Sequence, residues 1–357
     1  MTSLLDPITV GAIDAPNRIM MAPLTRGRAT RSHVPTPLMG EYYSQRASAG
    51  LIISEATGIT RQGLGWPSAP GLWSVEQVNG WKPVVRAVHD AGGHIFAQLW
   101  HMGRLVHPDY LGGAQPVSAS ATTAPGHAHT YEGAKPYAES RALEPHEIKQ
   151  IIDDYGVAAE HAMSAGFDGV QLHAANGYLI DQFLRDGTNR REDSYGGPVE
   201  NRIRLLIEVT QTLIKAAGVD RTGVRLSPND DPQGCGDSES ETLFAKAAEA
   251  LDKLGIAFLE MRASRPESTF RPASRQLVPA IRRAFKGTLI LNSDYGLDDA
   301  SQALHLGEAD AIAFGRPFLA NPDLPARLAK RAVLNAPNAK TFYTSGPAGY
   351  TDYPALT

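Results

Sequence analysis

The chain has 357 residues, of which 42% are hydrophobic and 20% are charged, and its formal net charge is −4. This composition is typical of a globular protein with a sizeable core, and the charge argues against the basic surface that binds nucleic acids. Cys235 is the only cysteine, which excludes an intrachain disulfide and a thiolate metal cluster. The N-terminal segment lacks an apolar signal region and no run of about 18 apolar residues could span a bilayer, so we expect a cytoplasmic protein.

Short apolar segments alternate with longer segments of helical periodicity along the whole chain. The apolar segments are almost continuously apolar, which is typical of parallel strands that are buried on both faces. We therefore predict eight strands, at residues 18–23, 51–57, 94–101, 169–173, 223–228, 257–261, 288–293 and 311–315.

The segments between these strands carry helix start and stop signals. One begins at Glu144 and Pro145 and ends at Gly166, and further helices are expected at 200–217, 239–254, 273–285 and 297–306. Eight strand–helix units predict an α/β fold, a (β/α)8 TIM barrel that forms a single domain over residues 1–357. A doubly wound open sheet is the alternative.

Two segments interrupt this alternation. Residues 102–144, after the third strand, are rich in glycine, proline, alanine and serine and are too long for an ordinary connection. We expect them to form an excursion over the mouth of the barrel. Residues 336–357 form a tail rich in proline, glycine and tyrosine after the last helix.

Catalytic groups of a barrel come from the C-terminal ends of its strands. No lysine falls at these ends, which disfavours Schiff-base chemistry, and no group of acidic residues and histidines there has metal-ligand spacing. We therefore expect no metal site.

The segment HAANGY, residues 173–178, follows the fourth strand. His173 and Asn176 are three residues apart, so one turn would point both side chains the same way, and two such donors suit an oxygen that gains negative charge during a reaction. Tyr178, a phenol that is protonated at neutral pH, could deliver a proton. The spacing fits equally a core histidine beside a capping asparagine, so the alternative of a purely structural turn stays open.

Two arginines suggest an anionic ligand. Arg225 lies within an apolar strand, where a cation needs either an internal carboxylate or an electron-rich ligand. Gly315 and Arg316 follow the last strand, where barrels commonly bind phosphate, and arginine can hold phosphate oxygens in a bidentate manner. No GxGxxG motif follows a strand, so a Rossmann nucleotide-binding domain is not expected.

Over nearly its whole length the chain resembles the Old Yellow Enzyme family, in particular its bacterial ene-reductases. The matching motifs are NRIMMAPLTRGRA (17–29), SEATGI (54–59), AQLWHMGR (97–104), HAANGYLIDQFL (173–184), YGGPVENR (195–202), GVRLSP (223–228), AFGRPFLANPDL (313–324) and GYTDYP (349–354). The resemblance implies a tightly but non-covalently bound FMN across the C-terminal face of the barrel, with NADPH or NADH as the reductant.

The resemblance also implies a role for individual residues. His173 and Asn176 would bind the substrate's carbonyl or nitro oxygen, and Tyr178 would be the proton donor. Trp100 and Tyr350 would line the substrate cavity. The residues that would bind FMN are Pro23, Leu24, Thr25, Ala56, Gln98, His173, Arg225, Ser293, Gly315 and Arg316.

The implied reaction reduces activated C=C bonds of α,β-unsaturated ketones, aldehydes, imides and nitroalkenes. Hydride passes from FMN N5 to Cβ, and Cα is then protonated. The expected partners are therefore NAD(P)H and a small electrophilic alkene, with no nucleic acid and no membrane, and the chain is expected to be a monomer or a weak homo-oligomer.

Three features depart from the family pattern. Asp294 would repel a phosphate unless it points away, Arg262 stands where relatives are less basic, and the loop NDDPQGCGD (229–237) is individual. Two alternatives remain. One is a different flavin barrel, such as a dihydroorotate or 2-hydroxy-acid oxidoreductase. The other is a flavoprotein barrel with another electron acceptor or a redox-sensing role, and Cys235 would be important for that role.

Overall fold

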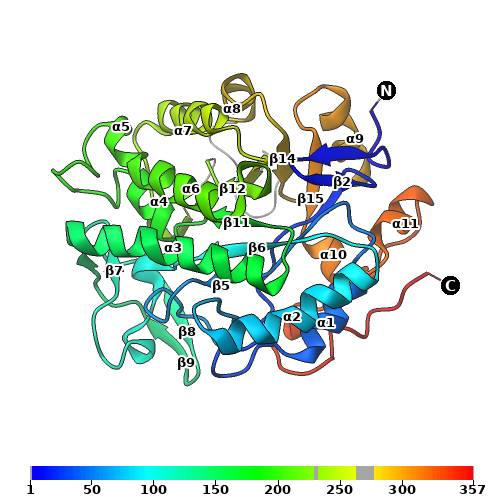
Figure 1. Ribbon diagram of the computed structural model, residues 1–357, viewed down its shortest axis with the longest axis horizontal. Helices are drawn as coiled ribbons and strands as arrows, with labels where there is room; N and C mark the ends of the chain where they lie inside the picture. Colours follow the sequence, from blue (N-terminus) through cyan, green and yellow to red (C-terminus); the bar gives the residue numbers. More distant parts are fainter. Residues whose placement is uncertain (1, 229–231, 263–276, 357) are drawn as a thin grey trace.

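A closed parallel barrel forms the centre of the protein in the computed structural model, which describes residues 2–228, 232–262 and 277–356 (Figure 1). Its strands are β3 (Ile19–Met21), β4 (Ile52–Ile53), β6 (Ile95–Trp100), β11 (Gly169–His173), β12 (Thr222–Leu226), β13 (Phe258–Arg262), β14 (Leu289–Asn292) and β15 (Ala311–Phe314). They pair in this order, and β15 pairs back onto β3, so the sheet closes on itself. Each predicted strand segment overlaps one of them, although β12 begins one residue before its predicted segment and β13 ends one residue after its own. The (β/α)8 barrel is therefore confirmed, and the open sheet is excluded.

Helices surround the barrel where the periodicity predicts them. The longest is α3 (Pro145–Ala165), and Gly166 ends it in a left-handed conformation with φ of 97°. The predicted helix 200–217 is two helices that meet at Ile203, and the first four residues of the predicted helix 273–285 lie outside the described residues. The remaining helices are α1 (Pro37–Ser44), α2 (Val75–Asp90), α4 (Leu179–Leu184), α5 (Val199–Arg202), α6 (Arg204–Ala217), α7 (Ser240–Leu254), α8 (Val278–Ala284), α9 (Leu297–His305), α10 (Arg316–Ala320) and α11 (Leu324–Ala329).

The lower half of the barrel interior is apolar and filled. An antiparallel hairpin, β1 (Ile8–Val10) with β2 (Ile13–Ala15), contributes Val10 to one apolar cluster with Phe96 and Phe258. Gly169 and Gly223 leave the space that these two rings occupy, because a Cβ at either glycine would lie within 2.4 Å of a ring carbon. The polar side chains that point into the barrel therefore lie above this apolar layer, toward the C-terminal ends.

Residues 102–144 form the predicted excursion. They contain the hairpin β8 (His127–Thr130) and β9 (Gly133–Pro136), and β7 (Val117–Ser118) pairs with β10 (Arg141–Ala142). Met102, Leu105 and Val106 bury their side chains in one cluster with Trp100 at the end of β6, and Tyr178 packs against that cluster. The excursion thus covers one side of the barrel mouth, beside the segment 173–178.

Two buried arginines hold the C-terminal tail against the same mouth. Arg26 donates hydrogen bonds to the carbonyl oxygens of Phe342 and Gly349, at 3.1 and 2.7 Å. Arg28 also donates to the carbonyl oxygen of Phe342, at 2.7 Å, and to that of Thr341, at 2.9 Å. These bonds fix the part of the tail that reaches the mouth.

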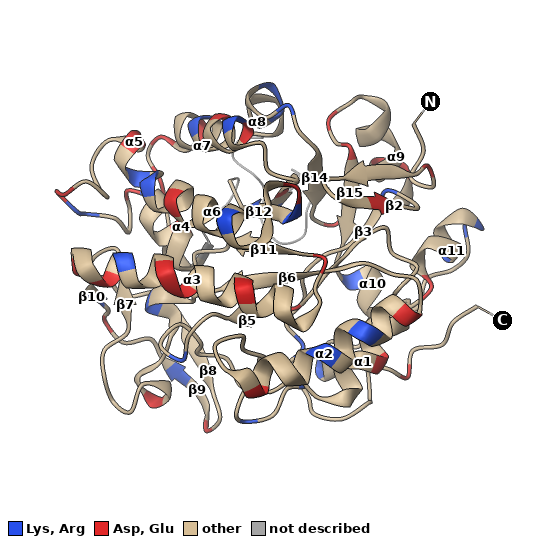
Figure 2. Cartoon of the chain, in the orientation of Figure 1, with Lys and Arg blue, Asp and Glu red and all other residues tan. Residues whose placement is uncertain are grey.

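Charges of both signs are interspersed over the outer helices, as Figure 2 shows for α3 and α7. In the described part of the chain, no helix combines the length and the apolar character needed to cross a membrane.

Candidate active site

A layer of buried polar side chains occupies the upper half of the barrel interior. Its members lie on five successive strands and are at most 8% exposed. The amide Nε2 of Gln98 donates to Gln171 Oε1 and Gln171 Nε2 donates to Glu260 Oε2, both at 2.7 Å. Arg225 donates from Nε to Glu260 Oε1 at 3.0 Å and from Nη2 to Asn292 Oδ1 at 2.8 Å. The buried cation of the sequence analysis therefore has an internal carboxylate as its partner.

Glu260 is a residue that the sequence analysis missed. The signal was available, because a carboxylate in the middle of the apolar run AFLEM is as costly to bury as the cation Arg225. Strand pairing places the two opposite one another in register, Arg225 on β12 and Glu260 on β13.

Two atoms of this layer have no hydrogen-bond partner among the described residues. They are the acceptor Gln98 Oε1 and the donor group at Arg225 Nη1. A planar ring whose edge carries an N–H beside a carbonyl would satisfy both, and the pyrimidine edge of a flavin has that pattern. The residues present therefore fit the FMN that the family resemblance implies.

His173 ends β11 and is a neutral donor. The backbone N–H of Ala175 donates to His173 Nδ1 at 3.3 Å, so the proton of the neutral ring resides on Nε2. Burial, and then the nearby Arg225, lower the pKa of His173 well below its usual value of 6.5. The uncharged ring thus offers an Nε2–H group at neutral pH.

Asn176 is oriented by Arg262. The residue adopts a left-handed backbone conformation with φ of 59°, which asparagine tolerates better than most residues, and its N–H donates to Ser227 Oγ at 2.7 Å. Arg262 Nη1 donates to Asn176 Oδ1 at 2.9 Å, so the amide Nδ2 is the donor end, and it has no partner among the described residues. Arg262 therefore acts within the site, where the sequence left its role open.

A buried ion pair beneath the turn holds the segment 173–178 in place. Asp181 and Arg185 are both 0% exposed, and Asp181 Oδ1 lies 2.8 Å from Arg185 Nε. The other oxygen of Asp181 accepts the backbone N–H of Gly177 at 2.9 Å, and Gln182 Nε2 donates to the Gly177 carbonyl at 2.8 Å. Residues of α4 thus fix the backbone between Asn176 and Tyr178.

Tyr178 stands beside these donors as a protonated phenol. Its ring meets the rings of Trp100 and His173 edge-on, each at a centroid distance of 4.9 Å. Burial raises the pKa of the Tyr178 hydroxyl above its usual value of 10, so the group keeps its proton through the physiological range. The hydroxyl has no hydrogen-bond partner within the described ranges.

A pocket of about 380 Å³ lies at the mouth, where Tyr178 forms part of its wall. It brings together the segment after the first strand, the start of α10 and the C-terminal tail. Its lining residues are Pro23, Leu24, Thr25, Arg26, Trp66, Tyr178, Arg316, Leu319, Phe342 and Tyr343.

Two residues expected in the substrate cavity lie elsewhere. Tyr350 is 0% exposed and stacks on Tyr42 with ring centroids 4.0 Å apart, so the prediction for Tyr350 is corrected: the tail lines the pocket with Phe342 and Tyr343 instead. Trp100 is 1% exposed and lies behind His173 and Tyr178, where it supports both rings. Ala56 is buried in the same apolar cluster as Trp100.

The residues predicted to bind phosphate lie close together, but the carboxylate of Asp294 lies among them. Ser293 and Asp294 have positive φ values of 136° and 46°, and Gly315 has open space around it apart from one side-chain carbon of Leu24. Arg316 Nη2 lies 3.0 Å from Asp294 Oδ1. Asp294 therefore faces the arginine that would hold the phosphate and does not point away from it.

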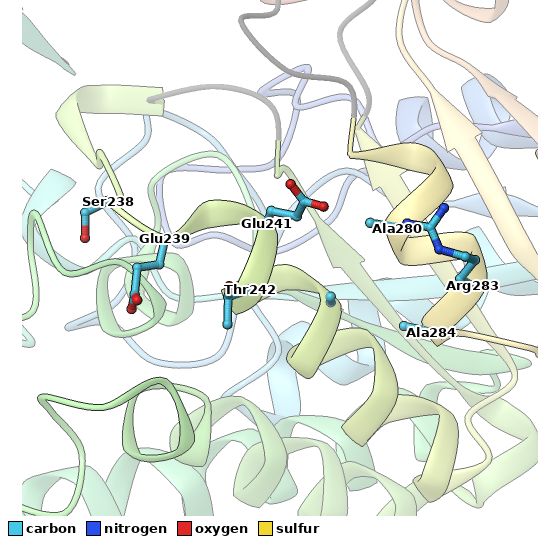
Figure 3. Close-up of a pocket in the computed structure, with 8 residues that line it drawn as sticks. Ser238, Glu239, Glu241, Thr242, Ala280, Arg283 and Ala284 are labelled. Carbon is cyan, nitrogen blue, oxygen red and sulfur yellow. The ribbon is translucent and has the colours of Figure 1, made fainter.

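A second hollow, of about 650 Å³, lies outside the barrel between α7 and α8 (Figure 3). No predicted site residue lines it. Its lining residues are Ser238, Glu239, Glu241, Thr242, Ala245, Ala280, Arg283 and Ala284. The convergent donors and the polar layer are at the barrel mouth, which is therefore the candidate active site.

Known proteins resemble this chain over its full length. The model of the NADH:flavin oxidoreductase / NADH oxidase family matches residues 3–335. The structure of an old yellow enzyme homologue from Zymomonas mobilis is 60% identical, with a TM-score of 0.98 over 99% of this chain and 100% of that one. Morphinone reductase in complex with tetrahydroNAD is 44% identical, with a TM-score of 0.94 over 100% and 98% of the two chains. A probable flavin mononucleotide-dependent alkene reductase of Leishmania infantum is 42% identical over 99% of this chain and 97% of its own. The chain belongs to the NADH:flavin oxidoreductase / NADH oxidase family, that of the Old Yellow Enzymes.

Proposed function

We propose that this chain is an FMN-dependent NAD(P)H ene-reductase, which reduces activated C=C bonds of α,β-unsaturated ketones, aldehydes, imides and nitroalkenes. The observation that carries the proposal is the set of three groups at the barrel mouth. His173 and Asn176 are both fixed with an N–H end that has no partner in the part of the chain that the structure describes, and the protonated phenol of Tyr178 lies beside them. FMN, when bound, would supply the chemistry by which a hydride from NAD(P)H reaches the alkene β-carbon.

The barrel mouth supplies contacts for each part of FMN. Gln98 and Arg225 would meet the polar edge of the ring, since one has an acceptor and the other a donor without a partner within the described ranges. Ser293, Gly315 and Arg316 would hold the phosphate. The residues proposed against the ring are Pro23, Leu24, Thr25, Ala56 and His173.

The donor pair would bind the substrate's oxygen. Negative charge grows on that oxygen as Cβ is reduced, so donors that already point at it stabilise the transition state more than the ground state. A neutral His173 is suited to this role, because it donates without needing a proton from solvent. Removing one such donor costs about 3–4 kcal/mol of transition-state stabilisation.

Tyr178 would complete the reaction by donating its hydroxyl proton to Cα. The raised pKa of the phenol keeps the proton in place until the substrate carbanion, a much stronger base, forms beside it. The tyrosinate is then reprotonated from solvent through the open pocket.

Burial of the thiol argues against the redox-sensing alternative. Cys235 is 0% exposed, and burial raises the pKa of its thiol to about 11. The reactive thiolate is therefore scarce at neutral pH.

The partners we propose are NAD(P)H and a small electrophilic alkene, both using the same open face. A single domain over residues 1–357, a monomeric or weakly associating chain without nucleic-acid or membrane partners, and a cytoplasmic location stay predictions from the sequence.

Anaerobic titration of the purified protein tests the function. The protein should be yellow, NADPH should bleach it, and 2-cyclohexenone should restore the colour with formation of cyclohexanone. A colourless protein that takes up no added FMN would refute the cofactor. Bleaching without recovery on addition of the enone, or of a nitroalkene, would leave a flavoprotein with another electron acceptor.

A further inference from the structure

We infer that Glu260 sets the hydrogen-bonding direction of Gln98 and balances the charge of Arg225, so that it controls both the affinity and the reduction potential of the bound flavin. The inference deepens the proposed function, because it concerns the ring of the FMN that we place above the polar layer. It assigns a role to a buried carboxylate in the interior of the barrel, 1% exposed, that neither binds substrate nor moves a proton.

The direction of the hydrogen bonds follows from the chemistry of the carboxylate. An ionised carboxylate only accepts, so Gln171 must turn its NH2 group toward Glu260 Oε2. The Oε1 atom of Gln171 then faces β6 and accepts from Gln98 Nε2. The amide of Gln98 must therefore point its Nε2 toward Gln171, and its Oε1 is the end without a partner among the described residues. Strand register keeps the order, because Gln171 and Gln98 lie directly opposite each other.

The charge of Arg225 is balanced within the same layer. Its Nε lies 3.0 Å from Glu260 Oε1, and the two side chains are 7% and 1% exposed, so little solvent screens the pair. A lone Arg225 would favour a flavin that gains negative charge on reduction. Because Glu260 offsets that cation, the site presents a hydrogen-bond donor at Nη1 with much less net positive charge.

The substitution Glu260→Gln would disturb both properties in a defined way. If the new amide keeps its oxygen on Arg225 Nε, its NH2 group faces the NH2 group of Gln171. Gln171 and then Gln98 must turn over, and Gln98 would present a donor to the N–H of the flavin edge. At the same time the cation loses its counterion.

We therefore expect Glu260→Gln to bind oxidised FMN less tightly and to have a more positive reduction potential than the wild type. A buried donor without a partner costs about 1–3 kcal/mol, so the Kd for oxidised FMN should rise roughly tenfold. If the affinity for reduced FMN is unchanged or higher, the ratio of the two Kd values changes by about tenfold or more, which for a two-electron couple is about 30 mV or more.

Two further variants separate the effects. Gln171→Met interrupts the hydrogen bonds but leaves the ion pair, so it should weaken FMN binding with little change in potential. Asn292→Asp places a second carboxylate at Arg225 Nη2, now 2.8 Å from the Asn292 oxygen, so it should lower the potential. Glu147→Gln, which removes an equal charge from a surface pair with Arg141, is the control and should change neither quantity.

The potential is measured on the holoenzyme by anaerobic reduction with a reference dye, and the Kd by the fluorescence of FMN released on dilution. Opposite shifts in Glu260→Gln and Asn292→Asp support the inference, and a merely structural role would not produce them. An unchanged or more negative potential in Glu260→Gln overturns it. If that variant does not fold, a potential in Asn292→Asp that does not fall overturns it equally. A yellow wild-type protein that fails to reduce enones would refute the proposed reaction alone, since both readouts still apply. A wild type that binds no FMN refutes both.

Discussion

Removing the Tyr178 hydroxyl is the sharpest test of the assigned proton donor. In Tyr178→Phe the ring keeps its edge contacts with Trp100 and His173, both at 4.9 Å, so the pocket wall is retained. The hydroxyl has no hydrogen-bond partner in the part of the chain that the structure describes, so its loss leaves no protein donor or acceptor there unpaired. We therefore expect a change in stability below about 1 kcal/mol.

The catalytic effect should be much larger than the structural one. A positioned general acid contributes about 10²- to 10⁴-fold, equivalent to roughly 3–5 kcal/mol of activation free energy. Reduction of the flavin by NADPH requires no proton from Tyr178 and should keep its rate. Reoxidation of the reduced protein by 2-cyclohexenone should slow by that factor.

Stopped-flow absorbance of the flavin measures the two half-reactions separately. A nitroalkene serves as an internal control, because the anion left after reduction of Cβ is stabilised by the nitro group and does not need immediate protonation. Reoxidation of Tyr178→Phe by the nitroalkene should therefore stay fast. Wild-type rates of enone reduction in this variant would refute the assignment and identify water or another group as the acid.

Three further predictions concern the surrounding residues. Burial lowers the pKa of His101 from its usual 6.5 to about 3. Below pH 6.5 the imidazole therefore binds a proton when the chain unfolds, and the folded state loses stability as the pH falls. This loss of unfolding free energy is roughly 2–3 kcal/mol between about pH 6.5 and 4.5. The denaturant midpoint of His101→Gln should therefore fall less over that pH range than the midpoint of the wild type. Parallel plots of midpoint against pH for the two proteins would refute the assignment. Asp294→Asn removes the negative charge that lies 3.0 Å from Arg316 Nη2 and would repel the phosphate, so it should lower the Kd for FMN roughly two- to fivefold, most clearly at low salt. Weaker binding would contradict the proposed competition. Asp181→Asn removes the carboxylate that lies 2.8 Å from the buried Arg185 Nε and should cost about 3–5 kcal/mol in urea unfolding. A cost below about 1 kcal/mol would show that the pair does not hold the turn.

The sequence by itself predicted the architecture, because the signals for it are local. Eight apolar segments correspond to the eight barrel strands, and Gly166 ends α3 where the pattern places the stop. The nearness of Gly315 and Arg316 to the segment after the first strand also follows once a barrel is assumed, since parallel strands end at one face. His173, Asn176 and Tyr178 were correctly placed at that face by their position after a strand.

The chemistry open to these side chains depends on contacts that form only in the folded chain. Spacing could not tell a donor from an acceptor, and the tautomer of His173 and the amide orientation of Asn176 depend on Ala175 and on Arg262, which lies 86 residues away. The pairing of Glu260 with Arg225 could not be predicted from the sequence, because sheet register and not sequence distance brings the two residues together.

The positions of the C-terminal tail and of Asp294 could likewise not be predicted from the sequence. The sequence placed Tyr350 in the pocket, but the hydrogen bonds of Arg26 and Arg28 to the tail backbone leave that tyrosine stacked in the core and put Tyr343 at the mouth. The sequence predicts that Asp294 repels a phosphate unless it points away, and in the structure it pairs with Arg316. Apolar periodicity is a local property of the chain, whereas hydrogen-bond direction and charge pairing depend on which distant residues the closed barrel brings together.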